Sequence, residues 1–407
     1  MMSVAADSLG HAQRIAFVLP GLRAGGSERV VSILADYWAA QGRDVTVITF
    51  EEPARMPYFS IDPRVRLTSL SISTGRLSPL RAASRIIRRV TALRRTLHLL
   101  EPQVIISFLT RTNITSILAA WGSGIPVIVS ERNNATEQTV DPFWVLARAA
   151  LYRRAYALVT MTRRSLESFP PSQRPRGRVI PNPVRLPGDL ISKRDGRILV
   201  AAGRLIPQKG FDLLLDAFAA VSDRFPDWTL VIWGEGDERS SLEAQRDRLG
   251  LANRVRLPGI SAKPGMWIES ADAFVLSSRF EGWAMVITEA MAAGIPVVSF
   301  DCAFGPAEQI QHNSDGLLVP SGNVAALSEA LARVMGDDLL RARLGNAAKL
   351  KARDHAPERI AAAWDALLDE ALAEHARQNP HRLDPEYPVR TWSTASSDAP
   401  ARRITRL

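Results

Sequence analysis

Two glutamates, Glu281 and Glu289, are the side chains whose type and spacing carry the most chemical information in this sequence. Glu281 lies in a loop after the strand pattern at 272–278, and a helix is predicted to begin near Ala284 and to end at Gly294. Glu289 then lies about one and a half turns into that helix, among small and apolar neighbours that favour its burial. A buried carboxylate needs hydrogen-bond donors, and the two vicinal hydroxyls of a ribose would supply them.

The same segment also offers backbone donors, because the amides at the start of the helix could hold a phosphate. The alternative is structural: Glu281 stabilises the helix N-terminus and Glu289 faces solvent. The position of the pair favours the first interpretation. It lies between two strong strand patterns, at the carboxyl edge of a predicted sheet, where open α/β sheets bind their ligands.

A second charged pair, Arg204 and Lys209, follows another strand pattern at 197–203. Arg204 leaves the carboxyl end of that strand, and Lys209 comes five residues later, just before a predicted helix. A planar guanidinium and an ammonium point charge at the mouth of a sheet suit a diphosphate. The alternative is that both residues are solvated cations of an ordinary loop.

A glycine-containing turn at 20–31 links the first strand pattern to the first helix pattern. Gly25 and Gly26 would let backbone amides approach an anion at the positive end of that helix. The spacing is neither the G-x-G-x-x-G dinucleotide fingerprint nor a P-loop, which needs Gly-Lys-Ser/Thr. A tight turn of any α/β domain is the alternative.

Parallel sheets must position these segments. Short, near-continuous Val/Ile/Leu runs alternate with helical patterns, which is typical of parallel strands covered on both faces. The alternation of strand and helix patterns begins again after residue 195, so the sequence predicts two doubly wound α/β domains. The predicted strands are 14–20, 44–50, 102–108, 125–130 and 156–161, then 197–203, 228–234, 254–259, 272–278, 295–300 and 316–320.

The boundary between the domains is predicted within 174–197, where Pro, Gly and charged residues cluster. We assign 14–185 to the first domain and 186–356 to the second. A long Ala-rich pattern at 357–378 predicts a terminal helix that packs back on the first domain. The tail, 379–407, is expected to be disordered.

The composition excludes fibrous, disordered and membrane-embedded proteins, since 46% of the 407 residues are hydrophobic and 23% are charged. The 51 basic and 42 acidic residues leave a net charge of +9, which suits nucleic acid, a phosphorylated small molecule or an acidic membrane surface. The single cysteine, Cys302, permits no internal disulfide and indicates a reducing cytosol. We predict no secretory signal and no membrane span; the nearest candidate, 114–130, is better explained by a helix and a strand.

Four motifs are specific in combination. They are G-R-L-x3-K-G-x-D-x-L-L-x-A-F from Gly203, a later G-E-G, R-V-x-L-P-G from Arg254, and E-G-x5-T-E-A-M-A-x-G-x-P-V-V from Glu281. Together they resemble glycosyltransferase family 4, whose members are retaining, nucleotide-sugar-dependent enzymes of GT-B architecture. The resemblance implies an α/β fold with two Rossmann-like domains facing an interdomain cleft. The first domain would bind the acceptor and the second the nucleotide sugar.

The resemblance also implies roles for individual residues. Arg204 and Lys209 would bind the donor diphosphate, Glu289 would bind the nucleotide ribose, and Glu281 would contact the donor sugar. Glu281, Arg204 and Lys209 are therefore our candidate catalytic residues. The other substrate-binding residues that it implies are Gly25 and Gly26 across the cleft, Leu257 and Gly259 near the base, and Gly282, Trp283, Ala284 and Met285 beside the donor sugar and phosphate.

This sequence departs from the family pattern in three places. The common E-G-F-G is E-G-W-A at Glu281–Ala284, and the frequent I-P-N-G-V is I-P-N-P-V at Ile180–Val184. The first-domain His that contacts the donor sugar in many members is absent, and that region reads S-E-R-N-N at Ser130–Asn134. This run resembles a subgroup that acts in bacterial lipid-linked glycan and exopolysaccharide assembly. Arg132 and Asn133 are candidates for the vacated role.

Transfer from a nucleotide-diphosphate sugar expels an anionic leaving group, and positive charge placed in advance lowers that barrier. Arg204, Lys209 and helix-start amides would supply this charge without a metal. The sequence has no D-x-D pair, which holds a divalent ion in the other major glycosyltransferase architecture, and its six His and one Cys argue against a transition-metal site. We therefore expect no metal and no cofactor, and retention of configuration through front-face departure and attack.

The helical pattern at 78–100 is amphipathic and strongly basic. Its apolar residues recur at helical spacing, as packing on the domain requires: Leu80, Ala83, Ile86, Val90, Leu93 and Leu97. Four arginines share the opposite face: Arg81, Arg85, Arg88 and Arg95. No acid lies between Pro63 and Leu100, so we expect this face to contact anionic lipid headgroups; a merely solvated face and nucleic-acid binding are the alternatives.

The sequence thus predicts a hexosyltransferase that moves a sugar from a UDP- or GDP-sugar to a glycan acceptor in bacterial surface polysaccharide synthesis. The expected acceptor is a polyprenyl-diphosphate-linked glycan, and the expected location is the cytoplasm, peripheral on the inner face of the plasma membrane. Alternatives are another GT-B enzyme, such as a phosphorylase or an epimerase, and a non-catalytic sugar-nucleotide-binding or assembly subunit. We expect no nucleic-acid partner, because no aromatic platform or recognition motif accompanies the basic residues.

Overall fold

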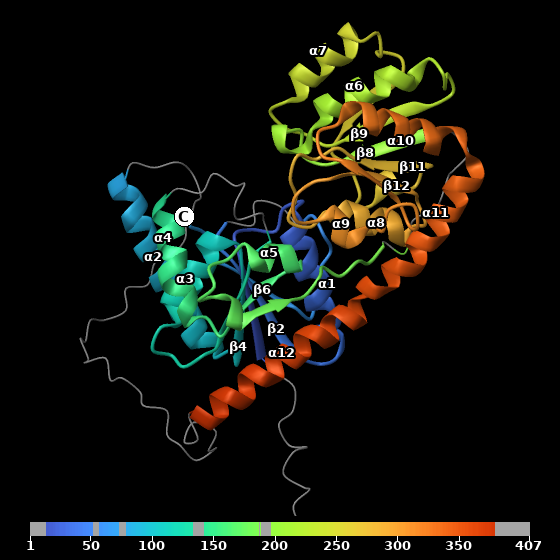
Figure 1. The fold of residues 1–407 in the computed structure, drawn as a ribbon. Coiled ribbons are helices and arrows are strands. Elements are labelled where there is room, and N and C mark those ends of the chain that lie inside the picture. The colour runs from blue at the N-terminus through green and yellow to red at the C-terminus, as the bar shows by residue number, and fades with distance from the viewer. Residues whose placement is uncertain are drawn as a thin grey trace, which may run out of the picture.

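The computed structural model describes residues 14–51, 57–72, 79–132, 142–186, 188 and 197–378. In this part of the chain, two parallel β-sheets form, each with helices on both faces (Figure 1). The predicted doubly wound α/β architecture is therefore confirmed. The tail that we expected to be disordered, 379–407, lies outside the described residues.

The first sheet has the strand order β3-β2-β1-β4-β5-β6-β7, and all of its described neighbours are parallel. Its strands are β1 (Arg14–Leu19), β2 (Asp44–Thr49), β3 (Arg66–Ser69), β4 (Val104–Phe108), β5 (Val127–Ser130), β6 (Ala157–Thr160) and β7 (Gly177–Val179). Its helices are α1 (Gly26–Ala40), α2 (Pro79–Leu100), α3 (Thr110–Ala120), α4 (Pro142–Leu151) and α5 (Arg163–Glu167).

The second sheet has the order β10-β9-β8-β11-β12-β13 and is also parallel. Its strands are β8 (Ile198–Ala202), β9 (Thr229–Trp233), β10 (Val255–Gly259), β11 (Ala273–Leu276), β12 (Val297–Asp301) and β13 (Leu317–Pro320). The helices are α6 (Phe211–Ser222), α7 (Arg239–Arg248), α8 (Met285–Ala292), α9 (Pro306–Gln309), α10 (Val324–Gly336) and α11 (Asp338–Lys351).

Helix α12 (Pro357–Gln378) leaves the second domain and runs along the first (Figure 1). Its apolar residues Ile360, Trp364 and Leu368 recur every four residues and are buried in the first domain's core with Phe17 and Trp38. This spacing places the three side chains on one face of the helix. The helix therefore ties the two domains together, in addition to the direct linker at 180–197.

Every strand predicted from the sequence forms, but two strands were missed, β3 and β7. Both lie at the edges of the first sheet. Edge strands need less apolar surface than central ones, and neither the R-L-T-S of β3 nor the G-R-V of β7 contains an apolar run. Within the described residues, no helix is long and apolar enough to cross a membrane.

Candidate donor site between the two domains

Lys209 and Glu281 form a close ion pair at the carboxyl edge of the second sheet. Lys209 Nζ lies 2.5 Å from Glu281 Oε1, and their side chains are only 16% and 7% exposed. Ser278 Oγ donates a second hydrogen bond to Glu281 Oε1 at 2.6 Å. Glu281 therefore does not cap the following helix, as the structural alternative proposed; it neutralises a half-buried lysine.

The loop that carries Lys209 is fixed by the neighbouring strand-end loop. Lys209 ends a short 3₁₀ turn, and its carbonyl accepts a 2.9 Å hydrogen bond from Ser277 Oγ. Gly210 is the N-cap of α6 and has a left-handed φ of 60°, which glycine adopts at no steric cost. A Cβ at Gly210 would overlap the carbonyl oxygen of Ser277. The close approach of the two loops is thus what brings Lys209 to Glu281.

Arg204, the other predicted diphosphate ligand, is exposed and lies near the first domain. Its charge acts across the domain boundary on Glu28, in the first turn of α1. Burial raises the pKa of the Glu28 carboxyl, and the positive charge of Arg204 opposes that rise. The Glu28 carboxylate lies directly over Gly25, so the glycine loop predicted to face the diphosphate is covered by a carboxylate in this structure.

Glu289 is half-buried in α8 and is paired with a residue of the first domain. Its Oε1 lies 3.9 Å from Nε of Arg29, and the two side chains are 15% and 13% exposed. Burial raises the pKa of the Glu289 carboxyl to about 7, and the charge of Arg29 acts in the opposite direction. The burial predicted from its apolar neighbours is therefore present, whereas the arginine partner was not foreseen.

Gly282 lies against the backbone of the first domain. A Cβ at this position would be 2.7 Å from the carbonyl oxygen of Arg132 and 3.1 Å from Met161 Cε. The loop after Glu281 is therefore in direct contact with the end of β5. Only glycine fits here without moving one domain away from the other.

The side chain of Arg132 is not where the resemblance implied. It is buried under α12, with its guanidinium 4.9 Å from the ring centre of Phe108 and 5.8 Å from that of Trp364. One nitrogen donates to Asn182 Oδ1, and burial lowers the pKa of Arg132 to about 9. The backbone of Arg132 thus borders the donor loop, whereas its side chain points into the first domain. Asn133, the other candidate, lies outside the described residues.

The remaining residues of the donor loop are held by second-domain side chains. Trp283 is buried with its ring edge-on to His355, at a centroid distance of 5.2 Å. Ala284 exchanges two hydrogen bonds with the side chain of Gln309, so its amide is already used and is not free for a phosphate. Met285 begins α8 and approaches Gly26, because a Cβ on that glycine would lie 3.5 Å from Met285 Cγ.

Leu257 and Gly259, the predicted base neighbours, lie on β10 at the far end of the site. The Leu257 carbonyl accepts a 3.1 Å hydrogen bond from Arg239, which also pairs with Glu235. Gly259 has a φ of +93°, and a Cβ there would lie 3.1 Å from Glu235 Oε1. This arginine–glutamate pair fixes the loops after β9 and β10 relative to each other.

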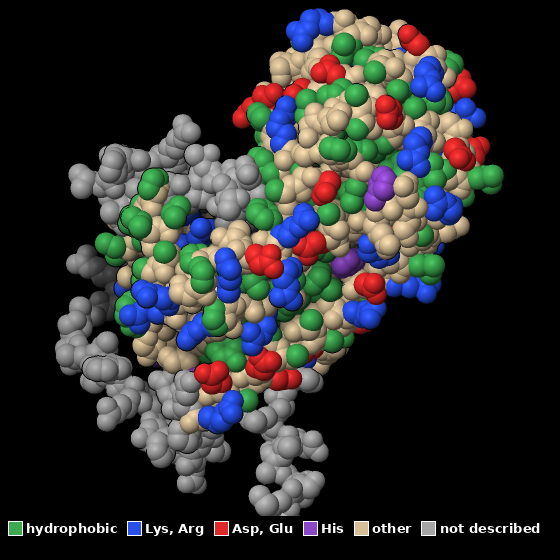
Figure 2. Space-filling view, in the orientation of Figure 1, with side chains coloured by type: hydrophobic (Ala, Val, Ile, Leu, Met, Phe, Trp, Pro, Cys, Tyr) green, Lys and Arg blue, Asp and Glu red, His purple; other side chains and the backbone are tan. Residues whose placement is uncertain are grey.

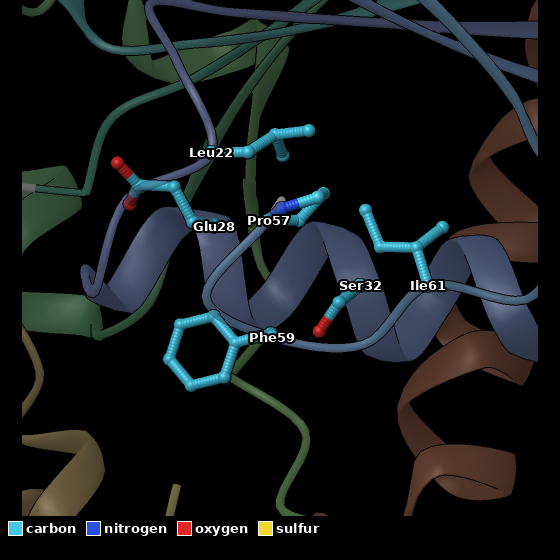
Figure 3. Close-up of a pocket in the computed structure, with 6 residues that line it drawn as sticks. All are labelled: Leu22, Glu28, Ser32, Pro57, Phe59 and Ile61. Atoms are coloured by element: carbon cyan, nitrogen blue, oxygen red, sulfur yellow. The ribbon is translucent and has the colours of Figure 1, made fainter. Parts of the chain in front are cut away.

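A small crevice lies beside Glu28 in the first domain (Figure 3). It is lined by Leu22, Glu28, Ser32, Pro57, Phe59 and Ile61, with Glu28 and Phe59 toward the same end. The crevice is too small to admit even a water molecule, so it is not a ligand pocket by itself.

The described residues contain neither a metal-binding cluster nor a reactive thiol. No group of three or more His, Cys, Asp or Glu side chains is placed to hold a metal ion in this part of the chain. Cys302 lies near Glu281, but burial raises the pKa of its thiol to about 12. A protonated, buried thiol is a poor nucleophile.

Sequence reasoning missed the contacts that join residues of the first domain to residues of the second. Arg29 pairs with Glu289, Tyr58 Oη donates to the Ser261 carbonyl at 3.2 Å, and Glu308 accepts hydrogen bonds from the amides that begin α5. The sequence interpretation of the run G-G-S-E-R rested on its glycines. Its two charged residues, Glu28 and Arg29, follow one residue after the glycines and were the available signal.

Residues 25–183 match the "Glycosyl transferase 4-like domain" family, and residues 187–351 match "Glycosyl transferases group 1". The chain is 28% identical to an exopolysaccharide phosphotransferase of Streptomyces coelicolor, over 91% of this chain and 42% of that protein. The chain thus spans less than half of that relative's length.

A second relative is matched along almost its whole length. It is the α-1,4-N-acetyl-D-galactosaminyltransferase of Campylobacter jejuni named for a PP-undecaprenol-linked glycan, 28% identical over 88% of this chain and 98% of that protein. Among solved structures, sucrose-phosphate synthase of Thermosynechococcus elongatus superposes with a TM-score of 0.76 at 20% identity, covering 89% of this chain and all of that one. Anabaena HepE in complex with UDP gives a TM-score of 0.67 at 20% identity, over 90% of this chain and 100% of the other.

The two family matches meet at residues 183–187, inside the predicted domain boundary, and together they extend over both sheets. The structural matches confirm the GT-B fold for the whole described chain. The expected enzyme class is confirmed by the same comparisons. The chain belongs to the glycosyltransferases of family 4 type, with a GT-B fold.

Proposed function

We propose that this glycosyltransferase is a retaining hexosyltransferase that moves a sugar from a UDP- or GDP-sugar to a lipid-linked glycan in bacterial surface polysaccharide synthesis. One observation carries the proposal: Arg204, Lys209, Glu281 and Glu289 gather at the carboxyl edge of the second sheet, against the first domain's glycine loop. The Campylobacter relative is named for a PP-undecaprenol-linked acceptor, and the Anabaena structure contains UDP. Both names support the donor and acceptor classes proposed.

The chain's own residues would divide the reaction between them. Arg204 and Lys209 would neutralise the charge that grows on the departing diphosphate. Glu281, oriented by Ser278, would accept hydrogen bonds from hydroxyls of the donor sugar. The acceptor hydroxyl would attack the anomeric carbon on the face from which the diphosphate leaves, and its proton would pass to the departing phosphate, so that configuration is retained.

We propose that the reaction needs no metal. Two cations already flank the position proposed for the diphosphate, and Lys209 is shielded from water strongly enough for its charge to act at close range. The charge that a divalent ion supplies in other architectures would come here from Arg204 and Lys209.

We also propose that the first domain docks on an anionic membrane surface. Arg88 and Arg95 of α2 are exposed, while Leu93 and Leu97 on its other face are buried in the core. Arg85 is half-buried, and the side chains of Leu80, Arg81 and Ala83 lie outside the described residues.

The neighbouring helix α4 adds apolar surface to the same side of the domain, where hydrophobic and basic side chains lie close together (Figure 2). None of the residues of α4 is buried, and Leu146 is 71% exposed. Both α2 and α4 pack on α3. Basic and apolar side chains together suit a bilayer interface better than either alone.

The experiment that tests the proposed function has two stages. Thermal-shift measurements with a panel of UDP- and GDP-sugars identify the donor, because a ligand that binds only the folded state raises the melting temperature. Transfer from that donor to a bacterial lipid extract is then measured, and the anomeric configuration of the product is determined by NMR. We expect turnover with retention, lost in Glu281→Ala and kept in Glu329→Ala, a control on the exposed face of α10.

Two results would contradict the proposal. Inversion at the anomeric carbon would exclude the retaining reaction. Stabilisation by a nucleotide sugar without transfer to any lipid fraction would favour the non-catalytic binding subunit. The inward-pointing Arg132 side chain makes that second outcome worth measuring, because Arg132 does not take the place of the family's histidine.

A further inference from the structure

Arg29 is a first-domain residue in contact with the carboxylate to which we assigned the donor ribose. It is the fourth residue of α1, and its Nε lies 3.9 Å from Glu289 Oε1 of α8. Both side chains are largely withdrawn from water. An ion pair in such surroundings is screened less by solvent than one on the surface.

Two separate segments fix the orientation of the Arg29 guanidinium. One terminal nitrogen donates to the carbonyl of Arg185, in the linker between the domains. The guanidinium also lies over the ring of Phe59, 5.0 Å from its centre. Phe59 is anchored in turn, because Tyr58 beside it donates to the Ser261 carbonyl of the second domain. Arg29 is therefore held in place by contacts that do not involve the donor.

Arg29 also dominates the electrostatic environment of Glu289. Burial raises the pKa of Glu289 to about 7, and among the described residues Arg29 is the only charged group with a resolved effect on it. The charged groups acting on Arg29 in turn are Glu289, Arg185, Asp36 and Tyr58. The other elements packed against α8 carry further ionisable residues, and none of these has a resolved effect on Glu289. They are Asp338, Arg341, Arg343, Lys349 and Lys351 of α11, Arg353, Asp354 and His355 after it, Glu308 of α9 and Asp301 of β12.

We propose that Arg29 is a positioning residue that favours the ionised form of Glu289 near neutral pH and so favours its acceptance of both vicinal hydroxyls of the donor ribose. The proposal rests on the proposed donor role of Glu289. An ionised carboxylate accepts with both oxygens and makes hydrogen bonds about twice as strong as neutral ones. A protonated carboxyl has one oxygen occupied by its own proton.

This arrangement couples donor binding to the approach of the two domains. Glu289 belongs to the second domain and Arg29 to the first, so the carboxylate has its cationic partner only while the domains are together. Separating the domains would remove that cation from the carboxylate.

The test is the pH dependence of nucleotide affinity, measured by calorimetry with UDP and with GDP between pH 5.5 and 9. The proteins are the wild type, Arg29→Gln, Arg29→Lys and Glu289→Gln. An opposite charge at this distance lowers a carboxyl pKa by about 1–3 units. At a pH below the pKa of Glu289, each unit by which that pKa rises lowers the affinity for the nucleotide about tenfold. Arg29→Gln should therefore bind at least about tenfold more weakly than wild type at pH 6 and approach it as the pH rises.

The other variants separate charge from packing. Arg29→Lys retains the charge and should keep a profile close to that of wild type, whereas Glu289→Gln should bind weakly with no midpoint near pH 7. The titration of the nucleotide itself is common to all four proteins and cancels in the ratios.

Two failures are distinguishable. If the wild type binds neither UDP nor GDP, the proposed function fails. If the wild type binds a nucleotide through Glu289, but Arg29→Gln follows its profile at every pH or Arg29→Lys behaves like Arg29→Gln, the role assigned to Arg29 is overturned.

Discussion

Replacing Lys209 by methionine tests whether the ion pair with Glu281 is structural as well as catalytic. Lys209 Nζ lies 2.5 Å from Glu281 Oε1, and the two side chains are 16% and 7% exposed. In Lys209→Met, Glu281 would keep the hydrogen bond from Ser278 but lose its countercharge. Removing one partner of a buried ion pair costs about 3–5 kcal/mol, and the retained hydrogen bond favours the lower end of that range.

The second variant completes a double-mutant cycle. In Lys209→Met/Glu281→Gln no charge is left unpaired, so most of the lost stability should return. A neutral pair of similar volume is often as stable as the buried ions that it replaces. The expected coupling energy is about 2 kcal/mol or more, which exceeds the ~0.5 kcal/mol typical of independent sites.

The assay is differential scanning calorimetry of the ligand-free proteins at pH 7.5. For a domain of this size, each kcal/mol of lost stability lowers the melting temperature by about 2–4 °C. Lys209→Met should therefore melt about 6–12 °C below wild type. Lys349→Met, on the exposed end of α11, is the matched control and should shift little. Sugar transfer should stay low in both the single and the double variant, because both lack the proposed diphosphate ligand. Equal melting of Lys209→Met and wild type, or a double variant no more stable than the single one, would refute the reasoning.

Three further predictions concern backbone geometry, metal dependence and membrane contact. Gly210→Ala and Gly250→Ala both place alanine at a left-handed φ, but only at Gly210 would the Cβ meet a backbone oxygen. Gly250→Ala should lower the free energy of unfolding by ~1 kcal/mol, and Gly210→Ala should lower it by at least about 1 kcal/mol more. Denaturant titrations of both variants measure the difference. Transfer activity should persist in excess EDTA; activity that disappears there and returns with manganese would contradict the metal-free mechanism. Replacing Arg88 and Arg95 by glutamine should weaken sedimentation with anionic liposomes while leaving donor hydrolysis unchanged, and unaltered sedimentation would argue against the docking surface.

The two sheets were predictable because their central strands must be apolar at nearly every position. In β4, V-I-I-S-F is buried throughout, and helices cover both faces of the sheet. The same reasoning fails at the sheet edges, where β3 is half exposed and hydrogen bonding alone defines the strand. Apolar periodicity therefore predicts the centre of each sheet better than its limits.

The second-domain site was predictable for a related reason. Lys209 and Glu281 follow strands β8 and β11, which are neighbours in the sheet, so their loops must meet at one edge. Strand order was not known from the sequence, but motif spacing placed both residues just beyond strand ends. Lys209 and Glu281 are indeed brought together.

The first-domain candidates could not be placed by sequence reasoning, because their orientation depends on tertiary packing. Glu131 and Arg132 follow β5 as consecutive residues, and consecutive side chains of an extended chain point to opposite faces. Glu131 packs with Tyr152 and Asn113 on one face, and Arg132 packs under α12 on the other. The family resemblance located the segment beside the donor loop, but only the packing shows that neither side chain points toward it.

The charges of the donor site are balanced before a donor arrives, and this has a measurable consequence. Glu281 is paired with Lys209, Glu289 is paired with Arg29, and Glu28 lies within the influence of Arg204. A diphosphate that binds Lys209 must compete with the Glu281 carboxylate for the same ammonium group. The sugar that follows it would then supply hydroxyl donors to the carboxylate thus released.

Glu281→Gln should therefore affect the nucleotide and the nucleotide sugar differently. UDP or GDP, which lack the sugar, should bind the variant as tightly as wild type or more tightly, because the competing charge is gone. The nucleotide sugar should no longer bind more tightly than the nucleotide alone, and the rate of sugar transfer should fall sharply. Calorimetric titration of both ligands into both proteins measures this difference. A variant that weakens nucleotide and nucleotide sugar by the same factor would show that Glu281 serves to hold Lys209 in place and does not contact the sugar.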